Sequence, residues 1–193
     1  MLDRYALEPA ARVLRALRVT PSAVTFLGLV LAAGAGALAG MGAFLPAALL
    51  LLGSGTCDLL DGALARLAHR ASRFGAALDS TADRLGEAAL FLGLLLFFHW
   101  QGSTLGVLLS ALALVGSFLV SYLRARAEGL GVGGSETGLM TRPERVVVLV
   151  ASLGLAQFVG PGAVLWGTAI VLALSLLTAG QRLYQVWGGT RTG

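Results

Sequence analysis

Acidic side chains interrupt long apolar runs in the middle of this 193-residue chain. Four of the five aspartates lie within 26 residues: Asp58, Asp61, Asp79 and Asp83. A charged group at membrane depth is costly, so it marks a functional site by default. On a helix, residues three or four apart share a face, so each pair of carboxylates points in the same general direction. Two such helices brought together predict an oxygen-rich pocket for hard divalent cations.

The composition indicates a membrane protein. The mean hydropathy is +0.82, and only 12% of the residues are charged, whereas a soluble domain has about 25%. The apolar stretches run for about 20 residues or more, which suits helices that cross ~30 Å of hydrocarbon. We therefore predict an all-α, polytopic membrane protein with a single domain over residues 1–193.

The apolar runs predict six transmembrane helices preceded by an interfacial amphipathic helix. The juxtamembrane segment is residues 1–18, and its helix, residues 2–17, directs arginines toward lipid headgroups. Thr20 is the expected N-cap of the first span, with Pro21 at the first helical position. The six-helix bundle covers residues 20–188, with spans at about 20–40, 43–68, 72–98, 103–128, 142–159 and 163–186, a Gly-rich loop at 129–138 and a turn at 160–162.

The distribution of arginine predicts the orientation in the membrane. The chain has no lysine, and 13 of its 14 arginines lie in the N-terminus, the 66–73 turn, the 124–145 segment or the C-terminus. The positive-inside rule therefore puts both termini and the aspartates on the cytoplasmic side of the cytoplasmic (inner) membrane. We expect no nucleic-acid partner, because these basic residues do not form an exposed stripe on a soluble domain.

The aspartates belong to a longer pattern, Asp58-x2-Asp61-Gly62-x2-Ala65-Arg66-x8-Gly75-x3-Asp79-x3-Asp83. It resembles the signature of the CDP-alcohol phosphatidyltransferases and matches all of its eight specified positions. The resemblance implies an enzyme that uses Mg2+ or Mn2+, with two ions in the site. It assigns metal binding to Asp58, Asp61, Asp79 and Asp83, of which Asp83 is also the catalytic general base. It assigns binding of the CDP-lipid to Gly62, Ala65, Arg66 and Gly75.

Three further segments resemble the bacterial phosphatidylinositol phosphate synthase branch of that family: residues 121–128, 142–145 and 181–183. The resemblance implies that Arg124, Arg145 and Arg182 bind the phosphate of the acceptor. Arg124 stands where the branch has lysine, and the Gly-rich loop is one residue longer. The implied reaction moves the phosphatidyl group of CDP-diacylglycerol, or an ether analogue, to a phosphorylated alcohol and releases CMP. Inositol 1-phosphate is the first choice of acceptor and glycerol 3-phosphate the second. The resemblance also implies a homodimer.

Other interpretations of the same residues stay open at this point. The four aspartates could form a structural network with nearby arginines, and Gly62 and Gly75 could serve close helix packing. Arg66 could extend toward the membrane surface as a positive-inside residue. An intramembrane prenyltransferase also uses Asp-rich helices, but its motifs lie farther apart. A divalent-cation transporter would need polar groups that continue toward the opposite face, where these spans are apolar.

Overall fold

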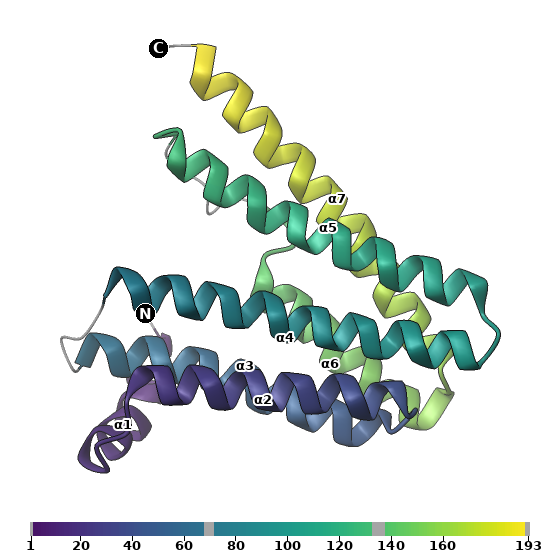
Figure 1. Cartoon of the computed structure of the whole chain (residues 1–193), viewed down its shortest axis with the longest axis horizontal. Coiled ribbons are helices and arrows are strands. Elements are labelled where there is room, and N and C mark those ends of the chain that lie inside the picture. The colour runs from purple at the N-terminus through teal and green to yellow at the C-terminus, as the bar shows by residue number, and fades with distance from the viewer. Residues whose placement is uncertain (1, 68–71, 133–137, 192–193) are drawn as a thin grey trace.

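The computed structural model describes residues 2–67, 72–132 and 138–191, and side chains within residues 9–190 of these ranges. This part of the chain is all helical, as predicted (Figure 1). Its seven helices are α1 (Leu2–Ala16), α2 (Pro21–Gly40), α3 (Phe44–Leu67), α4 (Arg73–Trp100), α5 (Thr104–Gly129), α6 (Arg142–Val159) and α7 (Gly162–Arg191). The predicted Gly-rich loop and the turn at 66–73 each lie partly outside the described residues.

Helix starts follow local side-chain chemistry. Thr20 accepts a hydrogen bond at Oγ1 from the backbone N–H of Ala23 at 3.3 Å, and Pro21 takes the first position of α2. This arrangement confirms the predicted start of the helix, because the cap satisfies one free backbone donor and proline needs none there. Ser72 and Ser103 cap α4 and α5 in the same way. The caps fix where the two helices that flank the site begin.

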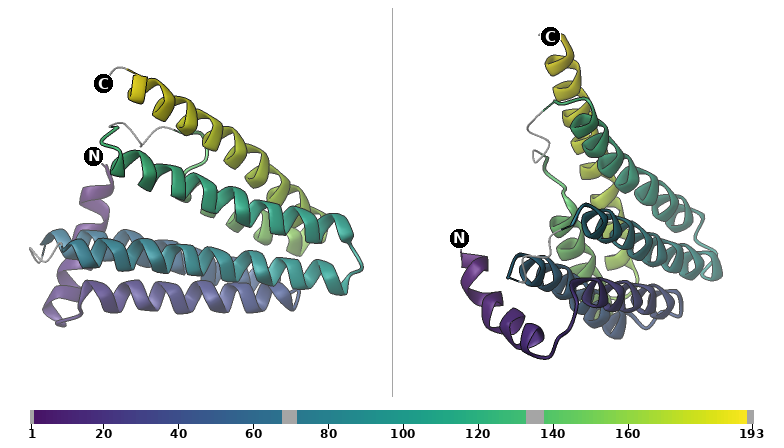
Figure 2. Two further views of the ribbon diagram at one scale, coloured as in Figure 1. Left: turned by 45° about the horizontal axis from the view of Figure 1, so that its top comes forward. Right: turned by 60° about the vertical axis from the view of Figure 1, so that its left-hand side comes forward.

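The helices form a bundle that is closed at one end and spread at the other. α2 packs against α3 and α4, α5 packs against α7 and α4, and α6 lies between α3 and α7. Figure 1 shows α4 and α5 side by side near their connecting turn and diverging toward the start of α4. In both views of Figure 2, α5 and α7 run together away from α2, α3 and α4. The spread end is the one that contains the C-terminal ends of α3 and α5.

A buried apolar cluster joins six of the helices in the closed part of the bundle. Within this cluster, the ring of Phe97 lies 4.9 Å from that of Phe44 and 5.3 Å from that of Phe98, with edge-to-face geometry. Leu94 on α4 and Leu153 on α6 are fully buried in the same cluster. Packing of this kind is close and specific, so it fixes how α4 sits against its neighbours.

Small residues allow α2 and α4 to approach closely. A Cβ atom on Gly93 would overlap the carbonyl oxygen of Gly36, and one on Gly36 would overlap the carbonyl oxygen of Ala89. Nearer the aspartates, a Cβ on Gly86 would lie 2.7 Å from the Cβ of Ala32. Small residues have this role in membrane helix packing, where they let backbones come together. We call this contact, formed by Ala32, Gly36, Gly86, Ala89 and Gly93, the α2–α4 seam.

Within the described residues, four helices are long and apolar enough to cross a membrane: α2, α3, α5 and α7, the last over residues 162–190. α4 and α6 are not among them, since α4 carries charged residues in its first half and α6 begins with three charged residues in its first four. The structure therefore supports a polytopic membrane protein with four candidate spans among the described helices, and the predicted number of six stays a prediction. α1 packs on α3, where Arg15 donates a hydrogen bond to the carbonyl oxygen of Leu67 at 2.9 Å.

We expect Gly93→Ala to lower the stability of the bundle, because the new methyl group would push α4 away from α2. Overpacking of this kind costs about 1–3 kcal/mol. Gly154→Ala in α6 is the matched control, because nothing in the described part of the chain lies within 4 Å of the added Cβ. The control should be neutral or slightly stabilising, since alanine is the better helix former. Thermal unfolding of both variants in detergent measures the difference; equal melting temperatures would contradict the close approach.

Candidate functional site

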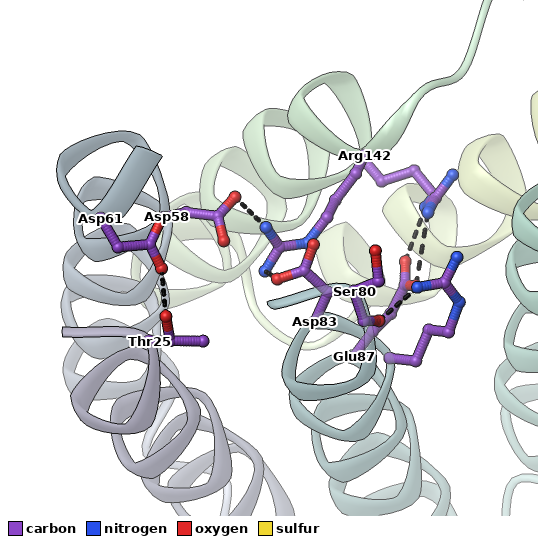
Figure 3. A network of polar contacts seen from close by, with 9 residues as sticks. Thr25, Asp58, Asp61, Ser80, Asp83, Glu87 and Arg142 are labelled. Carbon is purple, nitrogen blue, oxygen red and sulfur yellow. Dashed lines mark hydrogen bonds and ion pairs between the residues drawn. The ribbon is translucent and has the colours of Figure 1, made fainter. Parts of the chain in front are cut away.

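The end of α3 and the first half of α4 bring three of the four aspartates together. Asp58, Asp79 and Asp83 each offer a carboxylate oxygen, and these atoms lie within 4.8 Å of one another. We call these three residues the Asp cluster. Asp61 is buried, with 5% of its surface exposed, and its Oδ2 accepts a hydrogen bond from Thr25 Oγ1 at 2.6 Å. Figure 3 shows Asp61 turned toward Thr25 on α2.

Arg142, the first residue of α6, reaches into the Asp cluster. Its Nη1 contacts Asp58 Oδ2, and its Nη2 lies 2.9 Å from Asp83 Oδ1. Figure 3 shows the guanidinium between the two carboxylates. All three side chains are partly buried. One cation thus bridges an aspartate from α3 and an aspartate from α4, a role that the sequence did not assign to Arg142.

A second ion pair connects α4 to α6 beside the cluster. Arg145 Nε donates to Glu87 Oε1 at 2.6 Å and Nη2 donates to Oε2 at 3.3 Å, while Nη1 donates to the carbonyl oxygen of Met140 at 3.2 Å. Arg145 is only 2% exposed. Two hydrogen bonds from one guanidinium to one carboxylate fix the orientation of the guanidinium. Sequence reasoning missed Glu87, although its position four residues after Asp83 puts it on the same face of α4.

A cavity of about 1040 Å³ lies between α4, α5, α6 and α7 at the spread end of the bundle. Its polar wall includes Asp79, Asp83 and Arg142. The three arginines that sequence analysis proposed for an acceptor phosphate also line it: Arg124, Arg145 and Arg182. Arg182 is 3% exposed and donates from Nη1 to the carbonyl oxygen of Val120 at 2.7 Å. The structure therefore gathers arginines from α5, α6 and α7 around one space, which we call the arginine cavity.

A second cavity of about 520 Å³ lies on the other side of Asp79. The residues proposed for the CDP-lipid all line it: Gly62, Ala65, Arg66 and Gly75. Thr20 and Asp61 are also part of its wall. A Cβ on Gly62 would lie 3.4 Å from Arg66 Nη1, so the glycine leaves the guanidinium room beside the helix. We call this space the α3–α4 cavity; Ala76 and Asp79 line both cavities.

The chemistry of the Asp cluster fits a divalent metal ion. All three residues supply carboxylate oxygens, the ligands that Mg2+ and similar hard cations prefer. Asp79 Oδ1 is buried, and no hydrogen-bond partner for it is present among the described residues. A buried polar atom without a partner needs an explanation, and an ion is one of them. The excess of acidic groups and this oxygen therefore favour a cation at the cluster.

The sequence profile of the CDP-alcohol phosphatidyltransferases matches residues 18–179, which is most of the chain. The chain belongs to this family. It is therefore a membrane-bound transferase, and membership favours the enzyme over a structural acidic network, a prenyltransferase or a cation transporter. The matched region contains both aspartate pairs, Arg124 and Arg145, and ends just before Arg182.

Bacterial and archaeal relatives share more than a third of their aligned residues with this chain. The phosphatidylinositol phosphate synthase of Mycobacterium marinum is 38% identical over 188 residues, covering 93% of this chain and 79% of the relative. The archaetidylinositol phosphate synthase of Methanothermobacter thermautotrophicus is 35% identical over 164 residues, covering 85% of this chain and 81% of the relative.

Solved structures of the phosphatidylinositol phosphate synthase of Mycobacterium tuberculosis share the fold. The form with CDP-DAG bound gives a TM-score of 0.84 at 35% identity and covers 95% of this chain and 94% of that one. The form in complex with manganese and citrate gives a TM-score of 0.85 at 35% identity and covers 94% and 88% of the two chains. These likenesses extend over the whole bundle and not only over the aspartate motif.

We expect Glu87→Ala to destabilise the phosphatidyltransferase strongly, because it leaves the buried Arg145 guanidinium without its carboxylate. Breaking one half of a buried ion pair costs about 3–5 kcal/mol. Glu128→Ala is the matched control, since Glu128 pairs with Arg124 at 3.0 Å with both side chains about half exposed; such pairs contribute about 0–1 kcal/mol. Chemical denaturation in detergent compares the two variants.

The double variant Glu87→Leu with Arg145→Met tests the cause of this loss. Because it removes both charges, it should recover most of the stability, as paired replacements of buried ions often do. Equal destabilisation by the single and double variants would mean that packing, and not the unpaired charge, explains the effect.

Proposed function

We propose that this phosphatidyltransferase moves the phosphatidyl group of CDP-diacylglycerol, or of an ether analogue, to inositol 1-phosphate and releases CMP. The observation that carries the proposal is the convergence of Arg124, Arg145 and Arg182 on one cavity whose wall includes Asp83. Arginine binds phosphate through a planar fork of donors, so this wall suits an acceptor that carries its own phosphate. The names of the bacterial and archaeal relatives agree with such an acceptor.

The α3–α4 cavity is the proposed site for the CDP part of the donor. Arg66 supplies a cation for the diphosphate, and Gly62 and Gly75 let the ligand approach the helix backbones. The M. tuberculosis relative with CDP-DAG bound supports a donor of this class. Because Asp79 also lines the arginine cavity, the diphosphate and the acceptor would meet at the Asp cluster.

The Asp cluster would hold Mg2+ or Mn2+, with Asp61 as a further ligand and two ions in all. When bound, such a cation supplies charge neutralisation for the diphosphate and for the departing CMP. Carboxylates from two helices supply the oxygen ligands, and the complex of the M. tuberculosis relative with manganese supports this choice of cation.

Asp83 is the proposed general base. It lines the arginine cavity, where an acceptor hydroxyl would lie, and it belongs to the Asp cluster, where the diphosphate would lie. Its carboxylate takes the proton from the acceptor hydroxyl as that oxygen forms a bond to the β-phosphorus of the CDP-lipid. The bond from this phosphorus to the oxygen of CMP breaks, and CMP leaves with the electron pair. No covalent intermediate on the protein is needed.

We propose that α2 to α7 all span the membrane as one domain, with α1 in the interface. The apolar second half of α4 belongs to the buried cluster, and α6, although short, has about 27 Å of length. The positions of the arginines support an inner-membrane protein with its termini and its site on the cytoplasmic side. The homodimer implied by the family resemblance stays a prediction.

Asp83→Asn should reduce transfer by about 10²–10⁴-fold, because the amide cannot accept the proton from the acceptor hydroxyl. Binding of the CDP-lipid and of Mn2+ should be largely retained, since the amide keeps an oxygen that can face the metal. Asp79→Ala should instead lose Mn2+ affinity as well as activity. Radiolabelled transfer assays and Mn2+ titrations separate the two effects. Near-normal turnover of the Asp83→Asn variant would show that Asp83 is not the general base.

Replacing Arg124 or Arg182 with glutamine should raise the apparent KM for the phosphorylated acceptor more than that for the CDP-lipid. Arg145→Gln should do the same but should also lower stability, because it leaves the buried Glu87 carboxylate unpaired. A lost binding contact that acts equally in the ground and transition states appears in KM rather than in kcat. Arg126→Gln is the matched control, because Arg126 is an exposed arginine on the same helix as Arg124 and does not line either cavity.

An acceptor panel tests the proposed function as a whole. Inositol 1-phosphate should be the best acceptor, and free inositol, serine and choline should be used poorly, because they carry no phosphate for the arginines. Glycerol 3-phosphate is the second candidate, and preference for it would keep the phosphate site but change the alcohol. Equal use of free and phosphorylated alcohols would show that the acceptor assignment is wrong.

A further inference from the structure

Arg142 contacts two of the three carboxylates that a metal ion at the Asp cluster would use. Its guanidinium contacts Asp58 on one side and lies 2.9 Å from Asp83 on the other. The same two carboxylates, together with Asp79, offer the oxygens that lie within 4.8 Å of one another. Figure 3 shows that the arginine comes from α6, outside the two helices of the aspartate motif. A divalent cation bound at the Asp cluster would therefore share at least two carboxylates with this arginine.

Carboxylate oxygens that are engaged by a guanidinium offer fewer lone pairs to a cation. The charge-assisted hydrogen bonds of such a pair are also among the stronger ones in proteins. In the absence of another cation, however, three carboxylates this close together would repel one another. A resident arginine between them removes part of this repulsion and keeps the ends of α3 and α4 together.

We infer that Arg142 is the built-in counter-ion of the Asp cluster and that it exchanges against the divalent metal. The inference rests on the proposed function only in taking the Asp cluster as the metal site. Arg142 holds the carboxylates in place before the metal binds, and it releases at least one of them when the metal arrives. It is a positioning residue that sets the metal affinity, distinct from the three arginines assigned to the acceptor.

The neighbouring ion pair between Arg145 and Glu87 is more buried and has more hydrogen bonds than the contacts of Arg142. Arg145 and Glu87 share two hydrogen bonds, and their side chains are 2% and 10% exposed. Arg142 instead makes one contact to each of two carboxylates, and its side chain is 24% exposed. It also lines the arginine cavity, which gives the guanidinium about 1040 Å³ of adjoining space to enter when it leaves the aspartates.

The sign of the effect on metal binding tests the exchange. Mn2+ affinity is measured from the electron paramagnetic resonance signal of free Mn2+, with the purified full-length protein in detergent and without lipid substrate. Arg142→Gln should bind Mn2+ about tenfold more tightly than the wild type, a change of ~1.4 kcal/mol. Arg142→Lys should fall between the two, because a compact ammonium group does not span two carboxylates as a guanidinium does.

Arg84→Gln is the matched control for the general loss of one positive charge. Arg84 adjoins Asp83 in the chain, but its described hydrogen bond goes to the carbonyl oxygen of Ser80 and not to an aspartate. The control should change the Mn2+ affinity by less than about threefold, as expected for a charge without a direct contact. Without Mn2+, Arg142→Gln should melt at a lower temperature than the wild type, and saturating Mn2+ should raise its melting temperature by more.

The measured Mn2+ affinities decide whether Arg142 competes with the metal or supports its ligands. Unchanged or weaker Mn2+ binding in Arg142→Gln would overturn the inference, because an arginine that supports the metal ligands would weaken binding when removed. If Arg142→Gln does not fold, Arg142→Lys decides by the same criterion. If the wild-type protein binds no Mn2+, the metal site in the proposed function is wrong and the inference fails with it. If the wild type binds Mn2+ and neither Arg142 variant binds it more tightly, only the inference fails.

Discussion

Carboxylates placed among apolar helices have to be balanced by donors or cations from other parts of the chain. Thr25 on α2 donates to Asp61, and Arg142 on α6 bridges Asp58 and Asp83. An ionised group without such a partner would carry a large cost in a medium of low dielectric constant. The polar contacts therefore connect α2, α3, α4 and α6 at the site. The packing of the rest of the bundle has to hold these four helices where the contacts can form.

The apolar packing meets this requirement by holding α4 rigidly. The α2–α4 seam lets the backbones of α2 and α4 touch near Gly36 and Gly93. The buried apolar cluster holds the second half of α4, which contains Phe97. Glu87 follows the seam residue Gly86 in the chain and positions Arg145 at the edge of the arginine cavity. The site is thus built at the spread end of the bundle, while the closed end supplies its rigidity.

The sequence predicted most of the fold and the composition of the site, but not its internal pairing. Periodic spacing placed the aspartates on two facing helices, yet Asp58 and Asp61 differ by about 60° around α3, since successive residues turn by about 100°. That difference allows Asp61 to face Thr25. The contact of Arg142 with Asp83 joins residues far apart in the chain, so no local pattern contains it. Glu87 was within reach of the same spacing argument and was missed.

The membrane architecture was predicted less completely, for a related physical reason. Hydropathy identifies helices that are long and apolar enough to cross a membrane, and four of the described helices meet that criterion. α4 and α6 carry several charged residues each, which keeps them outside this group. In α6, buried Leu149 and Leu153 belong to the same cluster as Leu90 and Leu94 of α4. Charged residues therefore lower the hydropathy of α4 and α6, although both helices contribute to the buried apolar cluster.

The shared wall of the two cavities has a consequence for the order of events during turnover. Among the described residues only Ala76 and Asp79 belong to both linings, so the spaces proposed for donor and acceptor adjoin at one carboxylate. In the proposed function, the second substrate can therefore bind before any product leaves. This corresponds to a ternary complex and to intersecting lines in double-reciprocal steady-state plots.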